Sequence, residues 1–275
     1  MNAEMSTVTT PLLDVSLATL GQGTPLLYLH DVHFDLVDAD GHPPRIVELL
    51  SEAHTVYAPA LPGFRDLKEL AAVDNVADYV TVITDLLDTL NFEHIHIVGT
   101  GLGGWIAAEI AVQHPHRPRT LTLINAFGLR VEDHPIARFF DAGAPNPLGG
   151  RREIRELLFA DPDNEPGITA LPDFPDDHTN QQYFTHMHAA ARIGWSPPAF
   201  YNPKLHTRLH RITAPTHIIW ATNNTLVDTA HAHAYHTGIP NSTLTTIDHT
   251  AHAITLEQPD HLTKTITTYT EQHNT

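Results

Sequence analysis

The segment IHIVGTGLGGWIAA, residues 95–108, indicates the fold of this chain most directly. Its residues before Gly99 are apolar apart from His96, which predicts a buried strand. The glycines at 99, 101 and 103 then predict a tight turn, because glycine adopts backbone conformations that other residues avoid. From Trp105 onward, small apolar residues predict a helix packed closely on the sheet. A strand, a tight turn and a helix in this order are typical of a parallel α/β sheet.

The alternation of strand and helix continues on both sides of this segment. Short apolar runs that end in polar or turn residues predict strands, and apolar positions repeated every three or four residues predict helices between them. The expected strands are residues 26–29, 55–58, 94–98, 121–124, 218–220 and 244–247, and the expected helices are 76–90, 105–112 and one that begins at Pro259. This pattern predicts an α/β fold with a mostly parallel sheet flanked by helices.

One long stretch interrupts the alternation. Residues 128–211 are rich in Pro and Asp, show no evident strand, and contain helical patterns over 151–159 and 180–193. An insertion of this length between two strands of a parallel sheet is most simply a helical lid over one edge of the sheet. We therefore expect an α/β core made of residues 1–127 and 212–275, with a helical lid made of residues 128–211.

The composition limits what the chain can do. Hydrophobic residues are 41% of the 275 and charged residues 17%, which is enough apolar material for a folded core. The net charge of −17 repels phosphate backbones and anionic lipids, so we expect neither nucleic acid nor a membrane surface as a partner. The absence of cysteine excludes disulfides, a thiolate nucleophile and cysteine metal ligands. No secretory signal or membrane-spanning run is evident, so we expect a cytoplasmic protein.

The glycine turn resembles the nucleophile elbow of the α/β-hydrolase superfamily, whose pattern is G-x-S-x-G. Gly99 and Gly103 match the outer glycines of that pattern, and Gly101 stands at the position of its serine. The chain resembles the lid-containing branch of esterases and C–C hydrolases along almost its whole length. Four more segments are similar to family segments in the same order: 29–31 to the oxyanion loop, 58–64 to the turn after the next strand, 219–227 to the segment with the triad acid, and 249–253 to the segment with the catalytic histidine.

The resemblance implies a degenerate triad, with Gly101, Asn224 and His252 where the family has serine, aspartate and histidine. Glycine has no hydroxyl that could attack a carbonyl carbon and become acylated. An amide does not stabilise an imidazolium as a carboxylate does, and changing Asp to Asn in a serine-protease triad lowers kcat roughly ten-thousandfold. Asp31 replaces a glycine of the oxyanion loop and would oppose a developing oxyanion. An ordinary serine esterase is therefore disfavoured.

His252 is the residue most expected to retain chemistry, as a general acid or base. The resemblance puts Asp31 and His33 at the mouth of the pocket, so an Asp31–His252 pair or a His33–His252 pair is a candidate for proton transfer. Asp31, Asp228 and Asp248 are each candidates to replace the missing triad acid. The sequence does not choose between them.

The remaining candidate residues surround the turn. The backbone N–H of Leu102, at the start of a helix, is expected to face an oxygen in the oxyanion site. Thr100 is the hydroxyl nearest the elbow and should point away from the pocket, and His30 is expected to order its own loop. A purely structural explanation stays open, in which Gly101 relieves backbone strain in a protein that no longer uses a nucleophile.

A metal site is not expected, although the chain has 22 histidines. Histidines two residues apart diverge on a helix, and the pair on the strand before Gly99 should be buried by helices. No pair has the two-turn spacing or the nearby carboxylates of a zinc site, and we expect no cofactor. The pairs are His94 and His96, His114 and His116, His186 and His188, and His231 and His233.

Two functions fit these residues. The first is an enzyme without a serine nucleophile, in which His252 carries acid/base chemistry of a lyase, isomerase or cyclase, or activates water for direct hydrolysis. The second is a small-molecule binder that has lost its chemistry. In both, the ligand is expected to be small and mostly apolar, and a carbonyl compound in the case of the enzyme; the sequence identifies neither its structure nor the oligomeric state. Lid residues that could line its pocket, or could instead form the core of the lid, are Phe139, Phe140, Phe159, Phe184, Met187, Trp195 and Phe200.

Overall fold

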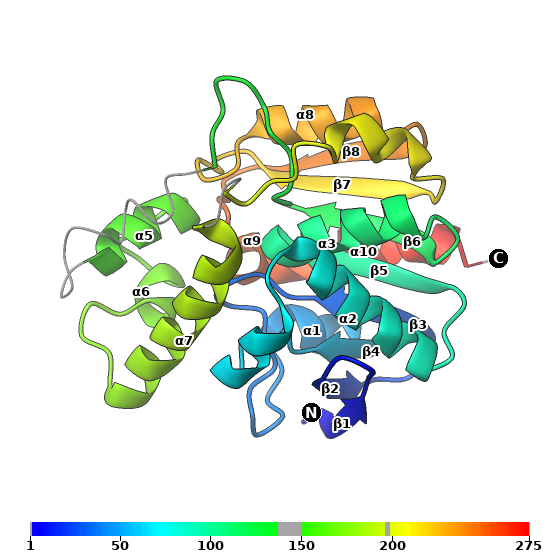
Figure 1. The fold of residues 1–275 in the computed structure, drawn as a ribbon. Helices are drawn as coiled ribbons and strands as arrows, with labels where there is room; N and C mark the ends of the chain where they lie inside the picture. Colours follow the sequence, from blue (N-terminus) through cyan, green and yellow to red (C-terminus); the bar gives the residue numbers. More distant parts are fainter. Residues whose placement is uncertain (1, 137–149, 196–198, 275) are drawn as a thin grey trace.

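The computed structural model describes residues 2–136, 150–195 and 199–274, through which an eight-stranded sheet runs (Figure 1). The strand order is β1-β2-β4-β3-β5-β6-β7-β8. β2 is antiparallel to both of its neighbours, and the other neighbouring strands are parallel, which confirms the predicted α/β class. The strands are β1 (Glu4–Thr9), β2 (Asp14–Leu20), β3 (Thr24–Leu29), β4 (His54–Pro59), β5 (Ile95–Thr100), β6 (Pro118–Ile124), β7 (Thr216–Ala221) and β8 (Ser242–Ile247).

The first two strands are not among those that the apolar runs of the sequence predict. β1 lies at the edge of the sheet, and none of its residues is fully buried. An edge strand with little buried surface has no strong apolar periodicity, and it is held mainly by its backbone pairing with β2.

Helices cover both faces of the sheet (Figure 1). α2, α3 and α8 pack with one apolar cluster, and α1 and α10 pack with a second cluster and with each other. α3 begins at Gly101, earlier than predicted, because the glycines of the turn form its first residues. The helices of the core are α1 (Arg45–Leu50), η1 (Leu67–Ala72), α2 (Val76–Thr89), α3 (Gly101–Gln113), α8 (Thr229–Gly238), α9 (Ile254–Glu257) and α10 (Pro259–Gln272).

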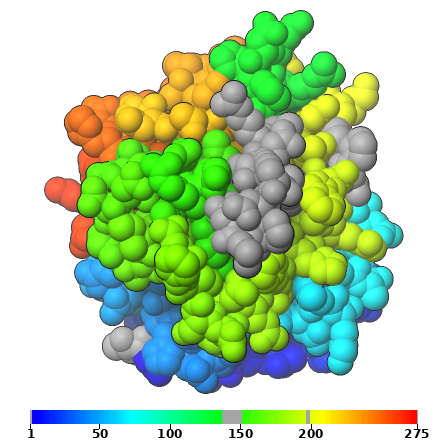
Figure 2. Space-filling view, turned by 90° about the vertical axis from the view of Figure 1, so that its left-hand side faces the viewer, coloured from blue at the N-terminus to red at the C-terminus, as the bar shows by residue number. Residues whose placement is uncertain are grey.

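The 128–211 insertion contains helices that lie together beside the sheet (Figure 1). They are α5 (Gly150–Leu158), α6 (Gly167–Ala170) and α7 (Asp177–Gly194). The insertion ends with the short η2 (His206–Arg211), which packs against α3 and α8 of the core. Figure 2 shows this side of the molecule, where residues of the insertion, green to yellow, cover the middle of the surface. That the insertion acts as a lid, with the domain boundaries given above, stays a prediction. Within the described ranges, no helix combines the length and apolar character that a membrane crossing requires.

Candidate active site

The turn between β5 and α3 is built around Gly101. Its φ is +47°, a left-handed conformation that glycine adopts without strain. The chain also approaches β3 closely at this turn, since a Cβ on Gly103 would lie 2.1 Å from the carbonyl oxygen of Leu29. The glycines therefore allow the start of α3 to approach the end of β3, where the loop that carries Asp31 begins.

The carboxylate of Asp31 occupies the space that a side chain at residue 101 would fill. A Cβ built on Gly101 would lie 2.0 Å from Asp31 Oδ1 and 2.4 Å from Oδ2. The backbone N–H of Leu102 donates a hydrogen bond to Asp31 Oδ1 at 2.8 Å, and Oδ2 lies 2.8 Å from Nε2 of His252. The structure thus brings Asp31, Leu102 and His252 together at the turn.

Asn224 contacts the other side of the His252 ring. Its side-chain oxygen accepts hydrogen bonds from the backbone N–H groups of Leu226 and Val227, at 3.1 and 3.0 Å. These bonds orient the amide so that its NH₂ group lies 3.2 Å from Nδ1 of His252. The imidazolium form of His252 donates to Asp31 from Nε2–H. In the neutral ring, Nδ1 accepts the bond from the amide, which leaves the ring proton on Nε2, where it is donated to Asp31. This tautomer is the reverse of the one in a serine triad, in which Nε2 accepts the nucleophile's proton.

Opposing effects act on the pKa of the buried Asp31 carboxyl. Burial works to raise it, but the charge and hydrogen bond of His252, together with the backbone N–H groups of Leu102 and Val32, lower the pKa of Asp31 to about 2. Only 15% of the Asp31 side chain and 3% of the His252 side chain are exposed. The pair is therefore a shielded carboxylate and imidazole in direct contact, an arrangement suited to moving a proton.

Two further residues hold the loop of His252, and neither gave a signal in the sequence. The amide group of Asn125 donates to the backbone oxygens of Ala251 and His252, at 3.2 and 3.0 Å, and its side-chain oxygen accepts the N–H of Ala221. The ring of Phe127 stacks on that of His252, with centroids 5.3 Å apart. Both residues follow β6, and no motif distinguishes them from ordinary loop residues.

The other candidates lie around this pair. His30 accepts the N–H of Leu61 at Nε2 and bonds the carbonyl oxygen of Asp31 through Nδ1, so it orders its own loop. His33 stacks on Tyr183 with centroids 5.7 Å apart, and burial lowers its pKa to about 3. The Thr100 hydroxyl donates to Asp35, on the core side of the turn.

Two other aspartates were candidates to replace the triad acid. Asp228 caps the N-terminus of α8 and bonds His134, and the backbone oxygen of Asp248 accepts a bond from Gln258. Among the hydrogen bonds of the described residues, the carboxylate that contacts His252 is that of Asp31.

A cavity of about 700 Å³ lies between the insertion and the core, next to His33 and Phe34. Its lining combines apolar residues with polar side chains, several of them from α7, and the mostly apolar ligand expected from the sequence stays a prediction. Phe159 and Phe200 are buried, Phe184 and Trp195 are largely exposed, and Met187 packs against the core. Of the aromatic and Met residues proposed for the pocket, those within the described ranges do not line this cavity, and Phe139 and Phe140 lie outside those ranges. The polar residues on α7 are His178, Gln181, Gln182, Thr185 and His186.

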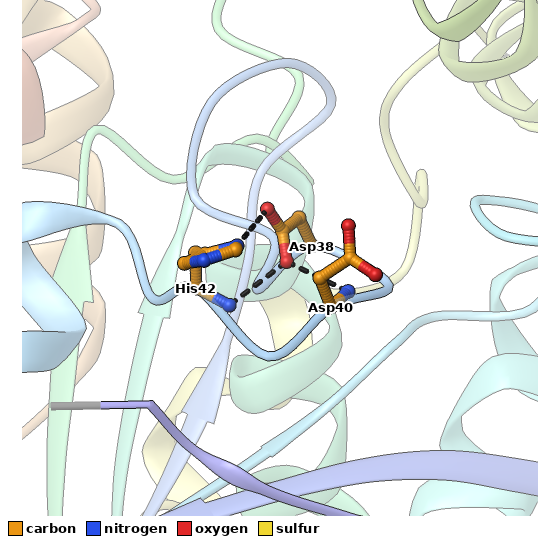
Figure 3. Close-up of side chains that lie close together, drawn as sticks. All are labelled: Asp38, Asp40 and His42. Carbon is orange, nitrogen blue, oxygen red and sulfur yellow. Dashed lines mark hydrogen bonds and ion pairs between the residues drawn. The ribbon is translucent and has the colours of Figure 1, made fainter.

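One group of possible metal ligands lies near the cavity (Figure 3). Asp38 Oδ1 accepts the backbone N–H groups of Asp40 and His42, at 2.9 and 2.8 Å, and Oδ2 bonds the His42 ring at 2.9 Å. Asp40 and His42 are exposed. These bonds are those of an Asx-type turn, which accounts for the grouping without an ion.

Comparison with known proteins agrees with this architecture. The sequence model of a family described as the alpha/beta hydrolase family matches residues 26–263. An uncharacterised protein of Mycobacterium tuberculosis is 26% identical over 249 residues, covering 84% of this chain and 71% of that protein. The 2-hydroxymuconate semialdehyde hydrolase of Pseudomonas sp. strain CF600 is 31% identical over 140 residues, covering 50% of this chain and 47% of that enzyme.

Solved structures show the same fold at lower identity. A bacterial membrane phospholipase A has a TM-score of 0.81 at 19% identity, covering 99% of this chain and 87% of that one. The 2-hydroxy-6-oxo-6-phenylhexa-2,4-dienoate hydrolase of Rhodococcus sp. strain RHA1 has a TM-score of 0.74 at 20% identity, covering 98% of this chain and 99% of that one.

Proposed function

The chain belongs to the alpha/beta hydrolase family, and from this premise we propose that it is a small-molecule enzyme in which Asp31 and His252 move protons without a serine nucleophile. One observation carries the proposal: the Asp31 carboxylate fills the side-chain space of Gly101 while it contacts both Nε2 of His252 and the N–H of Leu102. A carboxylate and an imidazole at this point can exchange protons with a bound molecule. The reaction is then a lyase, isomerase or cyclase reaction, or hydrolysis by direct attack of water.

In the mechanism, Asp31 is the base and His252 is the acid. A carbonyl oxygen of the substrate takes the N–H of Leu102 from Asp31 Oδ1 and is polarised by it. Losing this hydrogen bond raises the basicity of the carboxylate, because the bond favours its charged form. Asp31 then accepts a proton from a substrate carbon or from the attacking water. In its imidazolium form, His252 donates the Nε2 proton to the departing or newly charged atom and becomes neutral. Asp31 then passes the proton that it accepted to Nε2 through their contact, which restores the carboxylate and the imidazolium.

The substrate class is proposed from the relatives and from the cavity, which is lined by His33 of the Asp31 loop but not by Asp31 or His252 themselves. The lining includes glutamine, threonine and histidine side chains beside Phe34 and Phe64, together with the charged residues Asp38, Arg65 and Glu165. It suits a small molecule that has polar groups as well as an apolar part. Burial lowers the pKa of His186 to about 4, so this ring lines the cavity uncharged at neutral pH. Two relatives are a 2-hydroxymuconate semialdehyde hydrolase and a 2-hydroxy-6-oxo-2,4-heptadienoate hydrolase, the latter from Pseudomonas putida and 28% identical over 121 residues. Their substrates support a carbonyl compound as the substrate of this chain.

The test compares four proteins in a cell metabolite extract: wild type, His252→Ala, Asp31→Asn and, as a control, His261→Ala on the exposed side of α10. Mass spectrometry follows which molecules are consumed. We expect one to be consumed by wild type and His261→Ala, and at least 100-fold more slowly by the other two, in line with the roughly 10²–10⁴-fold contribution of a positioned acid or base. Gain of one water identifies hydrolysis, no change in mass an isomerase or cyclase, and two fragments without water a lyase. Equal consumption by all four proteins would contradict the proposal.

A second candidate function, that of a binder without turnover, is favoured by one contact. Asp31 Oδ1 already accepts the Leu102 N–H that a substrate oxygen would need, so this donor is occupied in the structure. A binder would consume nothing from the extract. Instead, one metabolite would raise the melting temperature of wild type and of His252→Ala alike.

A further inference from the structure

A second buried carboxyl belongs to the loop that carries Asp31. Asp35 is 3% exposed and follows Asp31 by four residues in the same loop. Its Oδ2 accepts a hydrogen bond from the Thr100 hydroxyl at 2.9 Å, and its Oδ1 accepts one from the Thr255 hydroxyl at 2.6 Å. A buried carboxyl with two side-chain partners from distant segments is an uncommon feature that the proposed mechanism does not use.

The two threonines belong to the segments that form the site. Thr100 immediately precedes Gly101, and Thr255 lies in α9, three residues after His252. Asp35 belongs to the loop that carries Asp31. One carboxyl therefore joins the glycine turn, the histidine segment and the aspartate loop. We propose that Asp35 is a positioning residue that holds Asp31 and His252 in register, an inference that rests on the proposed function of this pair.

The surroundings of Asp35 allow it to do this in either protonation state. Burial is the main cause that raises its pKa, to about 6, and the charge of Asp31 acts in the same direction, while the hydroxyls of Thr255, Thr100 and Tyr28 oppose the rise. When Asp35 is ionised, the Thr100 hydroxyl donates to it. When Asp35 is protonated, its own hydroxyl can donate to Thr100 Oγ1, which can turn its proton to the carbonyl oxygen of Leu29, 3.4 Å away.

The test removes the hydrogen bonds of Asp35 one at a time and follows the NMR signals of the His252 ring. Thr255→Val keeps the shape of the side chain and removes the hydroxyl, whereas Thr255→Ser keeps the hydroxyl. Each protein is labelled with ¹⁵N-histidine, and the ring signals of His252 are identified by their loss in His252→Ala. We expect Thr255→Val to shift these signals and to slow turnover of the metabolite found above by roughly 10- to 100-fold, because small displacements of reacting groups have effects of this size. Thr255→Ser should match wild type in both measurements.

Asp35→Asn is the second variant. Its amide has one acceptor oxygen, so residue 35 can accept the hydrogen bond of only one of the two threonine hydroxyls. Its urea unfolding curve shows whether it is folded, and we expect its His252 signals to shift as in Thr255→Val. Unchanged His252 signals in folded Thr255→Val and Asp35→Asn, or the same shift in Thr255→Ser as in Thr255→Val, would overturn the inference. The ring signals require no turnover. If His252→Ala retains activity while Thr255→Val moves the ring signals, the proposed chemistry fails and the positioning role stands.

Discussion

The carboxylate of Asp31 occupies the space that any side chain at residue 101 would need. Oδ1 of Asp31 lies 2.0 Å from the position of a Cβ on Gly101, closer than any non-bonded contact allows. The two residues are therefore a matched pair, and a hydroxyl at residue 101 requires a smaller residue at 31. Restoring serine alone would accordingly not restore an esterase, and a fair attempt would combine Gly101→Ser with Asp31→Gly and Asn224→Asp.

Gly101→Ser should destabilise the protein, and Asp31→Gly should relieve much of that loss. The serine side chain would meet the carboxylate and would also hold a φ of +47°, so we expect the free energy of unfolding to fall by at least about 2 kcal/mol. Urea unfolding of wild type, both single variants and the double variant measures the coupling. Simple additivity of the two single effects would show that the carboxylate and the new side chain do not compete.

At the scale of elements, the insertion is tied to the segment of His252 through one glutamate. Glu257, at the end of α9, accepts the backbone N–H of Ala160 and that of Ala251, each at 2.7 Å. The N–H of Ala253 donates to the carbonyl oxygen of Leu158 in α5, also at 2.7 Å. A movement of α5 would therefore be transmitted to both neighbours of His252.

Glu257→Gln should loosen this connection. An amide has one acceptor oxygen, so one of the two N–H groups would face an NH₂ group. Leaving the N–H of the buried Ala251 unpaired costs about 1–3 kcal/mol, whereas that of the exposed Ala160 can bond water. We expect faster hydrogen exchange at Ala160 and Ala251, while exchange in β5 stays as in wild type. Glu271→Gln, at an exposed position of α10, is the matched control. Exchange at both alanines that is as slow as in wild type would show that Glu257 does not tie the elements together.

At the scale of the whole molecule, several buried histidines make stability depend on pH. Burial lowers the pKa of His33 to about 3. It also lowers to about 4 the pKa values of four other histidines, His30, His96, His186 and His217. The unfolded chain, with histidine pKa values near 6.5, binds more protons than the folded one between pH 6.5 and 4, so stability is lost as pH falls through this window. Burial raises the pKa values of Asp35, Glu69 and Glu257, which acts in the opposite direction, but these are three groups against five.

The free energy of unfolding should accordingly fall by at least about 4 kcal/mol between pH 7 and pH 5, because each proton taken up on unfolding contributes about 1.4 kcal/mol per pH unit. Urea unfolding across this range measures the slope. In His217→Gln, the free energy of unfolding should change less steeply with pH near pH 5. The decrease corresponds to one proton fewer taken up on unfolding, or about 1.4 kcal/mol per pH unit. A stability that stays level from pH 7 to pH 5 would show that these rings are not kept neutral by burial.

Some of this architecture is visible in the sequence because it depends on local patterns. The apolar runs in β3 and β7 are continuous because these strands are covered on both faces. The glycines at the turn after β5 meet a backbone requirement that is evident from the sequence. The edge strand β1 cannot be predicted in this way because it buries few side chains and therefore has no apolar pattern. The order of the family segments also brought Gly101, Asn224 and His252 forward as candidates.

What the sequence by itself determined is therefore the α/β class, the glycine turn and the residues brought near it by strand order. Only the tertiary structure decided that the Asp31 carboxylate fills the space at Gly101, that Asn224 holds the His252 proton on Nε2, and that Asp35 bonds Thr255. The physical reason is the separation along the chain over which each kind of interaction acts. Periodicity and turn chemistry act over a few residues, whereas Asp31 and His252 are separated by 221 positions and Asp35 and Thr255 by 220. Contacts at that distance depend on how the finished sheet and its loops pack, which no local pattern encodes.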